Sequence, residues 1–134
     1  MKPYDVQEVE LAVAAPLAFA YIADPRRLPE WTHAFVSADD TSATMRTPAG
    51  ESRVGMAVDA RSETGTVDWT ITFPDGNVGR AHSRIVPLGA DRCAYTFVLH
   101  APPVPLERLE GSLAAQRETL ADELRRLKRA LERA

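Results

Sequence analysis

Three histidines suggest a possible zinc site, because neutral imidazole is a common metal ligand. They are His33, His82 and His100. His82 and His100 fall in two segments that alternate like paired strands, and a hairpin closed through the turn "PLGA" places His82 opposite Thr96 and His100 opposite Val78. Four residues along a strand span about 13 Å, whereas ligands of one zinc ion lie about 2 Å from it. We therefore expect no metal site and no cofactor.

Acid–base and nucleophilic chemistry has few candidates in this chain. Cys93 lies in the middle of an apolar strand, which indicates a buried and inert thiol. The sequence contains no Ser–His–Asp order, no glycine-rich phosphate loop and no HExxH motif. The two catalytic candidates are His33, which is close to Trp31, and Tyr95.

Small residues face large ones across the predicted hairpin. Cys93, Tyr95, Phe97 and Leu99 share one strand face, and the same register places Ile85, Ser83, Ala81 and Gly79 opposite them, in that order. A filled core would need volume on both strands. The pattern favours a cavity, and the alternative is that Trp69 or the C-terminal helix fills this space.

Residues of the C-terminal helix add polar groups to the predicted cavity. Its leucines recur at 106, 109 and 113 and then skip to 120, and the interrupted turn carries Gln116 and Arg117. Over a cavity, such side chains could hydrogen-bond a ligand. The candidate ligand-binding residues are Tyr21, Trp31, Met56, Trp69, Ser83, Tyr95, Phe97 and Gln116. This mixture of apolar walls and few polar groups suits a small hydrophobic or aromatic molecule. For Trp31, the alternative is that it only closes one end of the core.

The elements that must position these side chains follow from local patterns. Residues 4–13 predict a first strand, and Pro16 and Pro25 suit the first turns of two short helices. Asp24 caps the second helix and Pro29 ends it. Residues 32–99 predict six antiparallel strands, and residues 105–132 predict one long helix. A seven-stranded sheet curls, and the long helix is the element that can cover its concave face. Pairing of this helix with a second chain as a coiled coil is the lesser alternative.

Length, composition and net charge limit the classes of protein to which this chain can belong. The 134 residues fit a single domain, 45% are hydrophobic and 26% are charged, and the net charge is −3. This balance gives no reason to expect nucleic-acid binding. No segment resembles a secretory signal or approaches the roughly 20 apolar residues of a membrane helix. With one cysteine and no internal disulfide, the sequence predicts a cytoplasmic protein. Homodimerisation through the sheet edge or the C-terminal helix is a further hypothesis.

The order of elements, together with "VAAPLAFAYIADPRRLPEW" and "VPLGADRCAYTFVLHAPP", resembles the START-like (SRPBCC) superfamily over nearly the whole chain. Within it, the resemblance is to the group labelled polyketide cyclase/dehydrase-like. The resemblance implies an α+β helix-grip fold for residues 1–134, in which a curved seven-stranded antiparallel sheet grips the C-terminal helix and the two short helices form a notch.

Three functions are compatible with that frame, because one fold hosts many chemistries. Our leading hypothesis is a protein that binds a small hydrophobic or aromatic ligand between the sheet and the C-terminal helix. The alternatives are a polyketide cyclase/dehydrase-like enzyme that acts on such a ligand, and a protein-interaction module of the co-chaperone kind with a closed, dry interior and an apolar surface patch.

Overall fold

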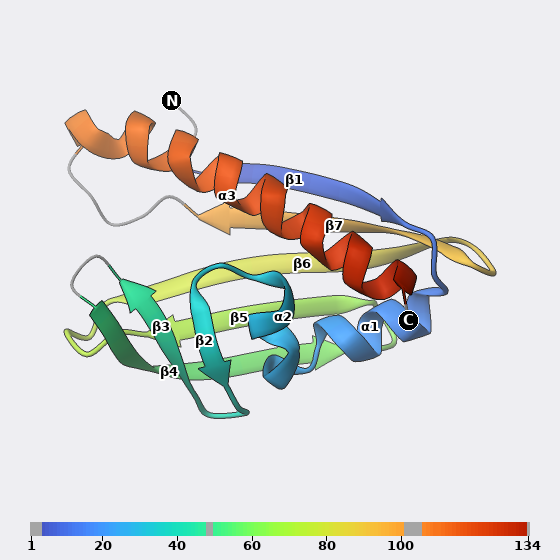
Figure 1. Cartoon of the computed structure of the whole chain (residues 1–134), viewed down its shortest axis with the longest axis horizontal. Helices are drawn as coiled ribbons and strands as arrows, with labels where there is room; N and C mark the ends of the chain where they lie inside the picture. Colours follow the sequence, from blue (N-terminus) through green and yellow to red (C-terminus); the bar gives the residue numbers. More distant parts are fainter. Residues whose placement is uncertain (1–3, 48–49, 101–105, 134) are drawn as a thin grey trace.

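The computed structural model describes residues 4–47, 50–100 and 106–133, without the side chains of residues 47 and 106–114. One antiparallel sheet of seven strands carries a long helix on one face (Figure 1). The elements in chain order are β1 (Tyr4–Leu11), α1 (Ala15–Ile22), the 3-10 turn η1 (Pro25–Arg27), α2 (Leu28–Trp31), β2 (Phe35–Ala38), β3 (Ser42–Thr47), β4 (Gly50–Arg61), β5 (Thr66–Thr72), β6 (Val78–Gly89), β7 (Arg92–His100) and α3 (Leu106–Arg133).

The strand order is β1-β7-β6-β5-β4-β3-β2, so the first strand of the chain closes against the last. α3 packs against β1 and α2, while α1 contacts β6 and β7. Figure 1 shows α1 at the same end of the molecule as the C-terminal end of α3. The predicted helix-grip α+β architecture is confirmed. Pro105, the predicted first residue of the long helix, lies outside the described residues. Within the described part of the chain, no helix combines the length and apolar character needed to cross a membrane.

The short helices begin where their prolines predict. Pro16 lies in the first turn of α1, and the Asp24 side chain accepts a hydrogen bond from the Arg26 backbone N–H at 3.0 Å ahead of Pro25. The predicted role of Pro29 was wrong. It lies in the first turn of α2, where its missing N–H breaks no helical bond, and the helix continues to Trp31.

The core lies between the concave sheet face and the helices. The buried α3 residues Leu120, Leu124, Leu127 and Leu131 recur at helical spacing, as the sequence predicts. The leucines at 106, 109 and 113 belong to the side chains that are not described. On the sheet side, alternate strand residues are buried, among them Val67, Trp69, Ile85, Tyr95 and Phe97.

The register of the β6–β7 hairpin corrects the sequence prediction. Ile85 pairs with Tyr95 and Ser83 with Phe97, which is two residues from the predicted pairing. The physical reason is the turn. Gly89 pairs directly with Arg92, and an irregularity between Pro87 and Gly89 absorbs one residue. A shift of two residues leaves every side chain on its predicted face, because strand side chains alternate with period two.

Candidate functional site

Aromatic rings on the concave face of the sheet form the centre of the candidate site. Trp69 on β5 and Phe97 on β7 lie on either side of β6, yet their ring centroids are 5.8 Å apart. They meet because the intervening β6 residues are small: Trp69 pairs with Ala81, and Phe97 pairs with Ser83. The space that the sequence assigned to a cavity above β6 therefore accommodates these two rings at least in part. Tyr95 meets Phe97 edge to face, with centroids 6.3 Å apart.

Three polar atoms in this interior lack a hydrogen-bond partner. Among the described residues, the buried side-chain atoms without one are Trp31 Nε1, Trp69 Nε1 and Tyr95 Oη. Trp31, Trp69 and Tyr95 are exposed by 2%, 5% and 0%, and all belong to the buried hydrophobic cluster. Buried polar groups are almost always paired, because an unmade hydrogen bond costs about 1–3 kcal/mol. Three such donors in one interior mark it as a candidate binding site.

Ser83 does not satisfy these atoms. Its hydroxyl donates a hydrogen bond to the Val67 carbonyl oxygen at 2.6 Å, across the β5–β6 pair. Burial raises the pKa of the Tyr95 phenol well above its usual value, although hydrogen bonding by the nearby Ser83 hydroxyl lowers it. The contact between these two hydroxyls lacks the geometry of a regular hydrogen bond, so Tyr95 Oη remains available to a ligand. Tyr95 therefore stays protonated at neutral pH and presents an O–H donor.

His33, the second catalytic candidate, is tied to α3. Its Nε2 lies 2.6 Å from Asp122 Oδ2, and its Nδ1 lies 3.2 Å from Arg126 Nη1. The guanidinium can only donate, so Nδ1 accepts and Nε2–H donates to Asp122. The His33 backbone N–H donates to Glu123 at 2.6 Å. Both ring nitrogens are thus occupied in a half-exposed network that joins the end of α2 to the long helix.

The other predicted site residues divide into two groups. Met56 on β4 is buried on the same core, opposite Ile71 of β5. The Tyr21 hydroxyl instead donates to Glu30 at 2.8 Å in an exposed position, and the Arg27 guanidinium lies 5.5 Å from its ring centroid. That hydroxyl is therefore occupied outside the core. Gln116 is half-buried on α3.

Sequence reasoning missed a polar group on the concave side of β1. Asp5 pairs with Leu99 and Gln7 with Phe97, so both share the face of Val9 and Leu11. Asp5 accepts hydrogen bonds from Gln7 Nε2 and Arg117 Nε, each at 2.9 Å. The signal was the strand alternation itself, which extends through Asp5 and Gln7 to the start of β1.

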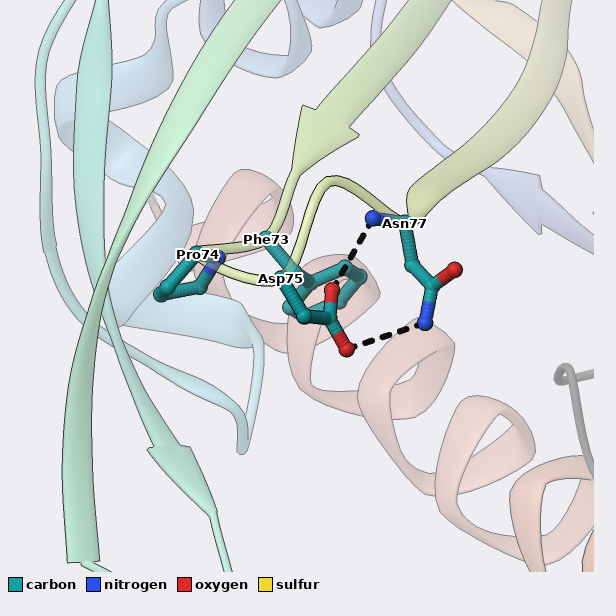
Figure 2. A pocket seen from close by; sticks show the side chains of 4 residues that line it. All are labelled: Phe73, Pro74, Asp75 and Asn77. Atoms are coloured by element: carbon teal, nitrogen blue, oxygen red, sulfur yellow. Dashed lines mark hydrogen bonds between the residues drawn. The ribbon is translucent and has the colours of Figure 1, made fainter.

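Hollows that open to solvent lie among the described residues near the rim of the molecule, and two of them concern the site. The larger has a volume of about 400 Å³ and is lined by Phe73, Pro74, Asp75 and Asn77 at the β5–β6 turn (Figure 2). The turn is held by two hydrogen bonds from Asn77 to the Asp75 carboxylate, at 2.9 and 3.0 Å. The smaller cavity, about 190 Å³, lies between β1 and α3 and is lined by Gln7, Glu8, Val9, Ala121, Leu124 and Arg125. Within the described ranges, no three His, Cys, Asp or Glu side chains gather closely enough to hold a metal ion.

Comparison with solved structures identifies the architecture. A START superfamily protein from Mycobacterium smegmatis superposes with a TM-score of 0.72 at 18% identity, over 96% of this chain and 98% of that one. The chain has the START-like fold. The chain also matches the di-domain ARO/CYC protein BexL of the BE-7585A biosynthetic pathway, with a TM-score of 0.74 at 12% identity over 98% of this chain and 47% of BexL. DynU16, from the dynemicin biosynthetic locus, matches with a TM-score of 0.64 at 18% identity, over 98% of this chain and 48% of DynU16.

Comparison at the level of sequence adds no family. No family model matches this START-like chain, and no curated protein does. At 12–18% identity the solved structures establish the fold alone, so the function must be argued from the interior side chains.

Proposed function

We propose that this START-like protein binds a small, mainly apolar or aromatic molecule in its interior, between the sheet and α3. The observation that carries the proposal is the set of three buried donors without partners, Trp31 Nε1, Trp69 Nε1 and Tyr95 Oη. A ligand that pairs with them would regain the hydrogen bonds that folding leaves unmade.

The donor set defines the ligand's polar groups. The two indole N–H groups can only donate, and the protonated Tyr95 phenol adds a third donor, its O–H. The ligand should therefore carry acceptors such as carbonyl or ether oxygens on an apolar or aromatic frame. The rings of Trp69, Phe97 and Tyr95 supply flat apolar contacts for that frame.

The cavity at the β5–β6 turn is the proposed entrance. Its volume of about 400 Å³ falls within the range of about 300–1,000 Å³ of small-molecule pockets. Phe73 lies at its inner side and packs against the core: Phe73 Cε2 would be 3.5 Å from a Cβ atom built on Gly79. Rotation of the Phe73 ring over the small Gly79 would connect the entrance with Ile71 and Trp69, the next inward-facing side chains along β5.

A cyclase/dehydrase-like reaction on such a ligand is the second candidate. The observation that favours it is Tyr95, whose hydroxyl could polarise a ligand carbonyl by hydrogen bonding. The fold shared with BexL is compatible with it. Binding alone ranks first, because the Tyr95 pKa is raised and both His33 ring nitrogens are occupied. A cytoplasmic location and a homodimer stay predictions.

A matched pair of probes tests the proposal. Fluorenone carries one carbonyl acceptor and fluorene has the same ring frame without it. The fluorescence of Trp31 and Trp69, the two tryptophans of the chain, reports directly on the interior. We expect saturable quenching by both probes, with tighter binding of fluorenone. In Tyr95→Phe, fluorenone affinity should fall about fivefold, the value of one neutral hydrogen bond, with fluorene unchanged.

Tyr21→Phe is the control, because its hydroxyl is bonded to Glu30 outside the core, and it should leave both affinities unchanged. Native mass spectrometry of the purified protein adds an independent search for co-purifying molecules. No co-purifying molecule, together with no saturable binding of either probe, would contradict the proposal and favour the interaction-module interpretation. Turnover of a bound polyketone by the native protein but not by Tyr95→Phe would favour the enzyme.

A further inference from the structure

Two histidines are neighbours on the convex face of the sheet, away from the buried site. His82 pairs with Val98, which places His100 diagonally across the β6–β7 ladder. Their ring centroids are 5.1 Å apart and the rings meet edge to face at 64°. The predicted separation of about 13 Å was wrong, because the hairpin register is shifted by two residues. At the observed separation, the two side chains can reach one metal ion.

The distance between the rings suits a shared metal ion. Two imidazoles that bind one tetrahedral zinc ion through nitrogens at about 2.0–2.1 Å have centroids about 5 Å apart. The observed 5.1 Å matches that spacing. The backbone ladder fixes the separation of these diagonal cross-strand positions, so binding would require rotation of the two rings but no movement of the strands.

Asp68 supplies the orienting group that such sites use. It pairs with His82 across the β5–β6 ladder, and its Oδ1 lies 3.3 Å from His82 Nδ1. Metal-binding histidines usually direct their second ring nitrogen at a carboxylate, which sets the tautomer and increases the basicity of the ligating nitrogen. Here Asp68 faces Nδ1 and leaves His82 Nε2 for the ion. Arg84, on the same face, donates from Nε to the Thr64 carbonyl oxygen at 3.2 Å.

We propose that His82 and His100 form a surface site for a divalent transition-metal ion, with Asp68 as the orienting residue and water as the remaining ligands. Imidazole ligands favour Cu²⁺, Ni²⁺ and Zn²⁺, whereas Mg²⁺ and Ca²⁺ require oxygen ligands. The site is independent of the interior and of its proposed ligand.

Isothermal titration of zinc chloride into the full chain without an affinity tag tests the site. We expect one ion per chain with micromolar affinity, tighter binding of Cu²⁺, and no competition from excess Mg²⁺. His82→Ala and His100→Ala should each weaken zinc binding at least about tenfold, and Asp68→Asn about tenfold or more through the orientation of His82. All three side chains lie on the solvent side of the sheet, so the variants should fold, which circular dichroism would check.

His33→Ala is the matched control, because His33 is held by Asp122 and Arg126 at the other face, and it should leave zinc affinity unchanged. The proposal is overturned if no saturable zinc binding is seen below millimolar concentration. It is also overturned if either His82→Ala or His100→Ala binds zinc like the native chain.

Discussion

Arg117 of α3 donates a hydrogen bond from Nε to Asp5 Oδ1 of β1 at 2.9 Å, and this ion pair joins the first strand to the long helix. The Asp5 side chain is only 11% exposed, whereas that of Arg117 is 52% exposed. The carboxylate thus depends on its partners for the hydrogen bonds that water would otherwise supply.

Arg117→Met should therefore destabilise the fold by about 1–2 kcal/mol, because it leaves a largely buried carboxylate with Gln7 as its remaining side-chain donor. Chemical denaturation measures the change. Arg125→Met is the control: its ion pair with Asp122 is exposed at 3.4 Å and should contribute little to stability. Equal losses in the two variants would contradict the role assigned to Asp5.

Tyr95→Phe should make the unliganded protein more stable by about 1 kcal/mol or more. The substitution removes a buried hydroxyl that has no partner and keeps the ring that packs on Phe97. The thermal midpoint should rise while the affinity for fluorenone falls. A lower midpoint in the absence of ligand would mean that the hydroxyl is paired in the native protein.

Gly65→Ala should be severely destabilising, by about 3 kcal/mol or more. Gly65 has a φ of +71°, and an added Cβ would lie 2.3 Å from the Ile85 carbonyl oxygen. The Gly65 backbone also bonds to β6, since the Ile85 N–H donates to the Gly65 carbonyl oxygen at 2.8 Å. Gly76→Ala separates the two effects: φ is +89° but the space is open, so only the conformational cost of about 1–2 kcal/mol applies.

Acid titration should distinguish two neighbouring carboxyls on α3. The hydrogen bond from His33 lowers the pKa of Asp122, so its ionised form stabilises the fold above the unfolded pKa of about 4, and this contribution is lost as the pH falls through the lower folded value. Desolvation raises the pKa of Glu123, so its ionisation opposes folding and stability is gained as the pH falls through the raised folded value.

Asp122→Asn should therefore be less stable than the native protein at pH 7, and the difference should shrink as the pH falls through the lowered pKa of Asp122. Glu123→Gln should show the opposite trend: its free energy of unfolding should exceed that of the native protein most at pH 7, where native Glu123 is ionised. Urea unfolding at pH 7 and at lower pH values measures the two trends. Parallel trends would contradict the assignment of the His33 hydrogen bond to the lowered pKa of Asp122 and of desolvation to the raised pKa of Glu123.

Much of the interior could be predicted from strand alternation. Trp69, Ser83, Tyr95 and Phe97 point inward as expected, because a side chain's face depends only on whether its position is odd or even within the strand. The same rule would have placed Asp5 and Gln7 on the concave face. The long helix and the position of Arg117 within it were also predicted. Nothing local indicated that this arginine would reach Asp5 on the first strand.

The sequence alone determined the order of elements, the inward faces and the helix starts at Pro16 and Pro25, because these depend on residues that are near one another in the chain. Tertiary structure decided the β6–β7 register, which placed His82 beside His100, and the partners of His33 on α3. It also decided that Trp31, Trp69 and Tyr95 are buried without partners. The hairpin register depends on the backbone conformation of the turn at Pro87–Gly89, which residue types alone do not fix. The other two features depend on atoms that are distant along the chain, and no local pattern encodes how such atoms meet.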